Sequence, residues 1–182
     1  EAEEDNVKST LGAIRLKSDV GRNLLRNSAS LTEWRASGEV DILDNDGTFN
    51  PTTAKIARVR TRNWGAEMKG VPTSLGDVWS FSFIARKGTS DGDIRAALMG
   101  RTIDDRHKGN WTPHIEKVYD LPNGWALYKG ENCIMNHEEV VHINIRFYNA
   151  GQTNDGYHDY ALPKLERGNK ATEYNFYKES TL

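Results

Sequence analysis

The most constraining feature of this sequence is a stretch near its C-terminal end in which apolar and polar residues alternate strictly. The apolar set is Val141, Ile143, Ile145 and Phe147. The polar set is His142, Asn144, Arg146 and Tyr148. Successive side chains of a β-strand point to opposite faces of its sheet, so this alternation predicts a long strand with one face in a core and one polar face.

Shorter runs with the same period of two occur along most of the chain, separated by Gly, Asn, Asp and Pro. They span residues 56–62, 79–83, 94–99, 124–128 and 158–165, and residues 23–25 are expected to open the first strand. Trp79 and Trp125 lie within apolar alternation and are expected in the core. Short strands with frequent turn residues predict an all-β, antiparallel sandwich or barrel.

Residues 1–20 differ from the rest of the chain, and we expect them to form a short N-terminal helix. The segment opens with acidic residues, which suit the positive end of a helix dipole. Val7, Leu11 and Ile14 are spaced four and then three apart, as in a heptad seam. Either a single amphipathic helix on its own domain or the end of a dimeric or trimeric stalk fits this spacing. With 182 residues in all, residues 21–182 are expected to form one domain.

Composition excludes several classes of protein. No apolar run approaches the roughly 20 residues of a membrane-spanning helix. Cys133 is the single cysteine, so neither an internal disulfide nor a multi-cysteine zinc site can form. The net charge of −2 gives no reason to expect a nucleic-acid partner.

Metal-binding patterns are weak. Asp41, Asp44 and Asp46 offer oxygen ligands for calcium, but their spacing does not match an EF-hand, and an Asx turn explains the same residues. We therefore expect no cofactor, with calcium at these aspartates as the alternative.

Two motifs near the ends of the domain resemble those of a known group of modules. Residues 23–28, Asn-Leu-Leu-Arg-Asn-Ser, resemble the opening strand of jelly-roll modules in phage tail and baseplate proteins. Residues 163–174, from Pro163 to Tyr174, resemble their closing signature, with Tyr174 where Trp is usual. The resemblance covers about residues 21–177.

This resemblance implies an antiparallel β-sandwich of the jelly-roll type, similar to carbohydrate-binding modules. Such modules occur in tail fibres, distal tail proteins and receptor-binding appendages. It further implies a place on the exterior of a virion, a host-surface or cell-wall saccharide as ligand, and other tail proteins as partners. A homo-oligomer is expected, and a trimer if residues 1–20 continue a stalk.

Saccharide recognition combines aromatic faces, which stack on sugar rings, with planar polar groups, which hydrogen-bond to hydroxyl groups. Three parts of the sequence offer both: residues 60–64, residues 110–114, and the polar face of 142–148 together with the loop 154–157. The candidate ligand-binding residues are Arg60, Arg62, Trp64, Trp111, Asn144, Arg146, Tyr148 and Tyr157. The competing interpretation for the arginines at 58, 60 and 62 is a solvated strand face.

Three functions remain open. The preferred one is a non-catalytic module that binds carbohydrate. The second is a purely structural tail or baseplate module that contacts protein. The third, an enzyme that degrades polysaccharide, is disfavoured because no nucleophile elbow, phosphate loop or zinc-protease motif is present, and acidic residues cannot be paired from sequence alone.

Overall fold

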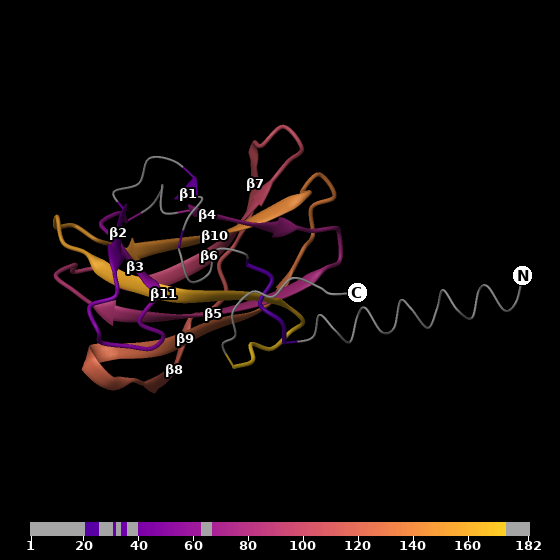
Figure 1. Ribbon diagram of the computed structural model, residues 1–182. Helices are drawn as coiled ribbons and strands as arrows, with labels where there is room; N and C mark the ends of the chain where they lie inside the picture. Colours follow the sequence, from indigo (N-terminus) through magenta and orange to yellow (C-terminus); the bar gives the residue numbers. More distant parts are fainter. Residues whose placement is uncertain (1–20, 26–30, 32–33, 36–39, 63–66, 174–182) are drawn as a thin grey trace, which may run out of the picture.

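The computed structural model describes residues 21–25, 31, 34–35, 40–62 and 67–173, which form two antiparallel β-sheets (Figure 1). The strands are β1 (Trp34–Arg35), β2 (Val40–Asp44), β3 (Lys55–Val59), β4 (Glu67–Pro72), β5 (Val78–Lys87), β6 (Asp93–Arg101), β7 (His107–Trp111), β8 (Glu116–Asp120), β9 (Trp125–Ile134), β10 (His142–Ala150) and β11 (His158–Arg167). A 3₁₀ turn, Pro122–Gly124, precedes β9. The predicted helix over residues 1–20 lies outside the described residues. Within them, no helix is long and apolar enough to cross a membrane.

One sheet has five strands in the order β1-β4-β10-β6-β7, and the other has six in the order β2-β3-β11-β5-β9-β8. From β3 to β6 each strand crosses to the opposite sheet, and β9, β10 and β11 do the same. Most hydrogen-bonded neighbours are therefore distant in sequence. The all-β sandwich that the alternating runs predict is confirmed.

The main core lies between β5 of the six-stranded sheet and β10 of the five-stranded sheet. Phe81 and Phe83 are fully buried, as are Ile145 and Phe147. The ring of Phe83 lies 5.2 Å from that of Phe147, centroid to centroid. These contacts confirm the predicted apolar faces of both strands. Val141 is the exception, because it precedes β10 and is 41% exposed.

Trp125 is buried as predicted, but outside the main core. It belongs to a smaller apolar cluster with Ile56 and Ile84, which lie on the outer face of the six-stranded sheet. Phe49 covers the indole with its ring centroid 4.8 Å away. A surface loop, rather than the opposite sheet, therefore buries this tryptophan.

Residues 23–25 of the opening motif form no strand, contrary to the prediction that they open the first one. Instead, the side chain of Asn23 forms hydrogen bonds to backbone groups of this segment and of β11. Its Oδ1 accepts hydrogen bonds from the backbone N–H groups of Leu25 and Leu165, at 3.0 and 3.3 Å, and its Nδ2 donates to the carbonyl of Pro163 at 3.2 Å. These three hydrogen bonds join residues 23–25 to β11 without the regular backbone pairing of a strand.

The closing motif supplies the other half of this junction. The Lys164 ammonium is fully buried and lies 3.3 Å from Oε2 of Glu166 and 2.6 Å from Oγ1 of Thr172. The carboxylate of Glu166 also accepts the Thr172 backbone N–H at 3.0 Å. The two motifs thus fasten residues 21–25 and 168–173 to β11, which gives them a structural role.

Candidate functional site

The polar face of β10 lies on the outer surface of the five-stranded sheet, where the sequence predicts it. Asn144, Arg146 and Tyr148 follow one another along the strand, and Ala97 and Arg95 of β6 lie directly opposite the last two. Asn144 and Arg146 are 3% and 8% exposed, and Tyr148 is half-buried. Two of the three side chains are therefore buried, and Tyr148 is the more exposed member of the row.

A carboxylate fixes this row in place. Glu67 of β4 is 6% exposed and accepts two hydrogen bonds from the Arg101 guanidinium, at 3.0 and 2.5 Å, and one from Nδ2 of Asn144 at 2.7 Å. The amide oxygen of Asn144 accepts the N–H of Gly70 at 3.0 Å. Both ends of the amide are thereby oriented. Sequence reasoning missed Glu67 because β4 lacks the alternation that identifies a strand, and it missed Arg101 because this residue ends β6 beyond the alternating run 94–99.

Arg146 and Tyr148 form the end of the row that lies beside Arg95 of β6. The guanidinium carbon of Arg146 lies 4.7 Å from the centre of the Tyr148 ring, within cation–π range. Burial lowers the pKa of Arg146, while Tyr148 and Glu67 act in the opposite direction. A guanidinium that water solvates poorly gains more from a new hydrogen-bond acceptor than an exposed one does.

His142 lies at the other end of the row. Burial, and then the charge of Lys69, lower its pKa, so the imidazole is neutral at pH 7. Its Nε2 atom is buried and has no hydrogen-bond partner in the described part of the chain. Buried polar atoms without a partner are uncommon in folded proteins.

The arrangement of carboxylates on this sheet is unsuited to glycoside hydrolysis. On β4, β10, β6 and β7 the carboxylates are Glu67 and Asp93. Glu67 shares a row with Ala97, four residues from Asp93 along β6, which is a rise of about 13 Å. Hydrolases place their two carboxyl groups about 5–9.5 Å apart.

Tyr157 does not join the β10 row, contrary to the grouping expected from sequence, and lies near Arg60, which belongs to another of the predicted groups. Both lie on the outer side of the six-stranded sheet, where Arg58 covers the Tyr157 ring with its guanidinium carbon 3.9 Å from the ring centre. Arg60 lies 5.5 Å from the same ring and forms an ion pair with Asp41 at 3.2 Å. The β3–β11 pairing, which sequence does not reveal, determines this placement. Arg62 is exposed beyond the end of β3.

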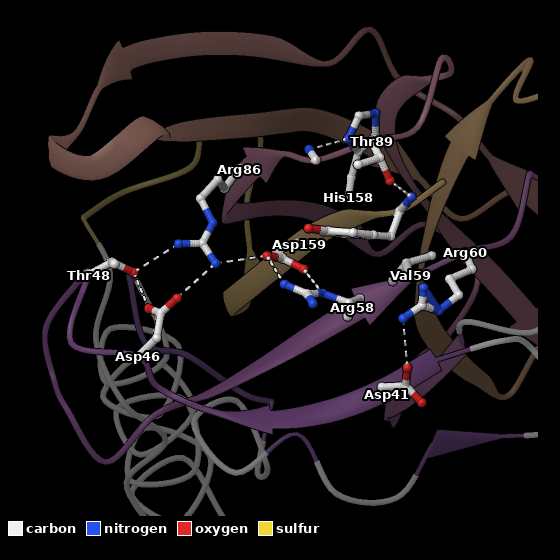
Figure 2. A network of polar contacts seen from close by, with 12 residues as sticks. Asp41, Asp46, Thr48, Arg58, Val59, Arg60, Arg86, Thr89, His158 and Asp159 are labelled. Carbon is white, nitrogen blue, oxygen red and sulfur yellow. Dashed lines mark hydrogen bonds and ion pairs between the residues drawn. The ribbon is translucent and has the colours of Figure 1, made fainter. Parts of the chain in front are cut away.

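Figure 2 shows the polar network that surrounds these residues. The carboxylate of Asp159 accepts hydrogen bonds from Arg58 at 2.9 and 3.1 Å and from Arg86 at 2.8 Å, and Arg86 also bonds to Asp46 at 3.1 Å. The hydrogen bond to Asp159 is the main cause that raises the pKa of Arg58.

This network is well suited to holding the sheet together. Its two positive and two negative groups balance, and each arginine covers an aromatic ring, since Arg86 lies 4.6 Å from the ring of Trp125. Both guanidinium groups are thus already engaged with carboxylates and rings of the chain itself. This agrees better with the strand-face interpretation of the arginines than with a ligand site.

Trp111, one of the two loop tryptophans, packs against the main core. Trp111 ends β7, is half-buried, and donates its indole N–H to the carbonyl of Ile134 at 2.9 Å. Its ring meets His137 edge-on at 5.8 Å between centroids. Trp64 lies outside the described residues.

The three aspartates considered for calcium do not converge. Asp41 pairs with Arg60, Asp44 with Lys55 and Asp46 with Arg86. Across the ranges that the structure describes, no cluster of three or more His, Cys, Asp or Glu side chains could hold a metal ion.

No protein-family model matches this chain, and no curated protein matches it by sequence. Solved structures match its fold. The xylanase 10B CBM22-1-GH10 modules of Clostridium thermocellum, complexed with xylohexaose, align with a TM-score of 0.54 and 11% identity over 85% of this chain and 30% of that one. The CBM22-1 xylan-binding domain of Paenibacillus barcinonensis Xyn10C gives 0.50 and 10% over 83% and 96%.

A phage protein shares the fold as well. The enzymatically active domain of bacteriophage CBA120 tailspike protein 4 aligns with a TM-score of 0.51 and 12% identity, over 80% of this chain and 21% of that domain. The chain thus spans about a fifth of the tailspike domain but nearly the whole xylan-binding module. At such low identity these likenesses show the fold alone, a β-sandwich like that of family 22 carbohydrate-binding modules.

Proposed function

We propose that this chain is a non-catalytic carbohydrate-binding module with jelly-roll topology, and that it binds saccharide on the outer face of its five-stranded sheet. The strand order supports the topology: β3-β11-β5-β9 in one sheet and β4-β10-β6-β7 in the other are two four-stranded sheets of an eight-stranded jelly roll. β1, β2 and β8 extend their edges.

The observation that carries the proposal is the ordered row on β10. Arg146 is a planar group of the kind that bonds to pairs of sugar hydroxyls, and Tyr148 adds an aromatic ring beside it, while Asn144 links the row to Glu67. Glu67 holds the row rigid, so little conformational entropy is lost on binding. The likeness to xylan-binding modules supports a saccharide as the ligand.

The setting we propose is the exterior of a phage virion, in a tail fibre, distal tail protein or receptor-binding appendage. The two end motifs and the likeness to a phage tailspike domain support it. A single saccharide site of this kind is weak, because each hydroxyl exchanges one partner for another. Several copies in an oligomer, such as a trimer, raise the effective strength through avidity.

A structural module that contacts protein is the second candidate, and one observation favours it. The turns at one end of the sandwich expose Leu75, Ile103, Ile134 and Val141, at 59%, 91%, 51% and 41%. Backbone hydrogen bonds join these turns, from Gly76 to Met135 at 2.8 Å and from Val141 to Arg101 at 3.0 Å. An apolar end of this type suits a neighbouring tail protein.

The test is a screen of the full chain, displayed in many copies on beads, against plant, bacterial cell-wall and capsular polysaccharides. Retention of at least one glycan, with no release of reducing ends during incubation, supports the proposal. Release of reducing ends makes the chain an enzyme. Absence of retention by every glycan overturns the proposal and favours the structural module.

The same screen separates the two non-catalytic functions further. An Ile103→Asp variant removes apolar character from the exposed end without touching β10. Under our proposal it retains the same glycans as the wild type.

A further inference from the structure

A cavity of about 440 Å³ opens at one side of the sandwich, apart from the middle of the β10 row. It is lined by the start of β6, by β8 and β9, and by the loop 88–92 that joins β5 to β6. On the edge of β6 away from β10, β7 pairs only with residues 98–101. Among the described strands, none pairs with residues 93–95 on that edge. The volume falls within the range of small-ligand sites, about 300–1,000 Å³.

Positive side chains surround this cavity. Lys87, Arg95 and Lys117 reach it from three different strands. Lys87 is exposed and forms no ion pair with any residue that the structure describes, and Lys117 pairs only with the exposed Asp120, at 3.0 Å. Surface pairs of this kind contribute little and are readily exchanged for another anion.

The lining contains two carboxylates, Asp91 and Asp93, and neither neutralises the positive side chains of the cavity strongly. Asp91 is turned toward the neighbouring loop, where it accepts the N–H groups of Thr153 at 2.8 Å and Asn154 at 3.3 Å. Hydrogen bonds from Thr153 also lower the pKa of Asp91, chiefly through its hydroxyl group. Asp93 is 73% exposed and lies 3.7 Å from the Arg95 guanidinium, a loose contact that a bound carboxylate can replace.

A phenol completes the lining. Tyr128 is half-buried and stacks on Phe83 with 5.5 Å between ring centroids. Burial raises the pKa of Tyr128, while the nearby charges of Lys117 and Arg95 act to lower it. The hydroxyl group therefore lies within electrostatic range of two cations, as an additional hydrogen-bonding group.

The floor of the cavity is rigid. His158 accepts the N–H of Gly88 at its Nδ1, at 3.0 Å, and its Nε2 lies 2.7 Å from the carbonyl of Gly92 (Figure 2 shows His158 beside this loop). Ser90 donates its hydroxyl to Gln152 at 2.7 Å. A side chain at Gly92 would meet the carbonyl of Asn149 at 2.9 Å, so the loop fits closely against its neighbour. A site fixed in this way loses little entropy when a ligand binds.

We propose that this cavity binds the carboxylate of an acidic saccharide, with Lys87, Arg95 and Lys117 around the charge. The planar fork of Arg95 suits a carboxylate, and the two lysines supply long-range attraction. Arg95 also lies directly opposite Tyr148 of the β10 row, so a glycan on that row can extend past Arg95 into the cavity. The inference rests on the proposed function, and it assigns that function a preference for charged glycans.

The experiment compares two forms of one oligosaccharide. Galacturonic-acid hexamers and their methyl esters have the same backbone and differ only in charge. Their dissociation constants are measured by calorimetry at low and high salt, for the wild type, a Lys87→Gln/Lys117→Gln variant and a Lys170→Gln control. The Lys170 side chain is 76% exposed. Lys170 follows the C-terminal end of β11, whereas the cavity lies at the first residue of that strand, His158. Unfolding midpoints verify that every variant is folded.

We expect the wild type and the Lys170→Gln control to bind the acid at least about tenfold more tightly than the ester at low salt, with the preference lost at high salt. The double variant should bind both forms equally. Equal binding of acid and ester by the wild type, or a preference that survives in the double variant, overturns the inference. If the inference fails in this way but the wild type still binds the ester, and Arg146→Lys weakens that binding, the proposed function stands.

Two further outcomes have defined meanings. A glycerol phosphate oligomer serves as the alternative anion, and tight binding of it without binding of the galacturonate overturns the carboxylate assignment. If neither the acid, the ester nor any screened glycan binds, both the inference and the proposed function fail.

Discussion

Replacing Glu67 by alanine should destabilise the protein strongly, because three hydrogen bonds, one buried and two partly buried, end on its carboxylate. The substitution leaves Arg101, whose side chain is 13% exposed, without its anion, and it leaves Nδ2 of Asn144 without an acceptor. Removing one partner of a buried ion pair costs about 3–5 kcal/mol. The remaining exposure of Arg101 allows some hydration, so we expect about 3 kcal/mol. For a domain of this size that corresponds to a fall in Tm of about 6–12 °C.

Urea and thermal unfolding, followed by circular dichroism, measure this loss. Glu67→Gln keeps an acceptor for the asparagine and should cost less than alanine. Replacing Glu67 and Arg101 together by methionine removes both charges and should recover part of the stability, since Nδ2 of Asn144 still lacks its acceptor. Glu116→Ala is the matched control, since that carboxylate is 59% exposed and should change stability by less than about 0.5 kcal/mol. A loss of unfolding free energy below about 1 kcal/mol for Glu67→Ala would mean that solvent screens the Glu67–Arg101 ion pair. It would contradict the claim that Glu67 holds the β10 row rigid.

Three further predictions concern stability and reactivity. Burial raises the pKa of Cys133 to about 12, so iodoacetamide at pH 8 should label the thiol in urea but not in the native protein; rapid native labelling would contradict its burial. The pKa of His142 is lowered on folding, so the unfolded chain takes up a proton first as the pH falls through about 6.5. Stability should therefore decrease from pH 7 to pH 5, and His142→Gln should reduce that decrease; an unchanged pH profile in the variant would refute this. Asn23→Ala leaves three backbone groups without partners and should cost about 2–4 kcal/mol in urea unfolding, whereas a loss under about 0.5 kcal/mol would show that the junction with β11 is dispensable.

The sandwich could be predicted because its central strands direct apolar side chains to the main core and mostly polar side chains to the other face, although both faces are largely buried. In β5 and β10 the alternation that follows from this is continuous, as with Phe81, Phe83, Ile145 and Phe147. The edge strands carry no such signal. β8 is exposed along its whole length, and β7 contains charged and small residues. Hydrogen bonds to a neighbour, rather than side-chain burial, make these segments strands.

The candidate site could be predicted only where it lies on one strand. Asn144, Arg146 and Tyr148 share a face because residues two apart in a strand point the same way. Tyr157 lies nine residues beyond Tyr148 in sequence, yet the intervening chain crosses to the other sheet, which separates the two rings. The contact between Glu67 and this row could not be predicted from sequence either. Glu67 meets Asn144 through a pairing of strands that lie more than seventy residues apart.

The most direct test of the proposed function compares variants of the two outer faces. For a glycan retained in the screen, dissociation constants are measured with Tyr148→Ala, Arg146→Lys and Tyr157→Ala, with unfolding midpoints as the check on folding. If saccharide binds on β10, Tyr148→Ala and Arg146→Lys should weaken binding at least about tenfold, or about 1.4 kcal/mol, while Tyr157→Ala changes it less than about twofold. Loss of binding in Tyr157→Ala alone, with the two β10 variants unaffected, would place the site on the six-stranded sheet and contradict the assignment.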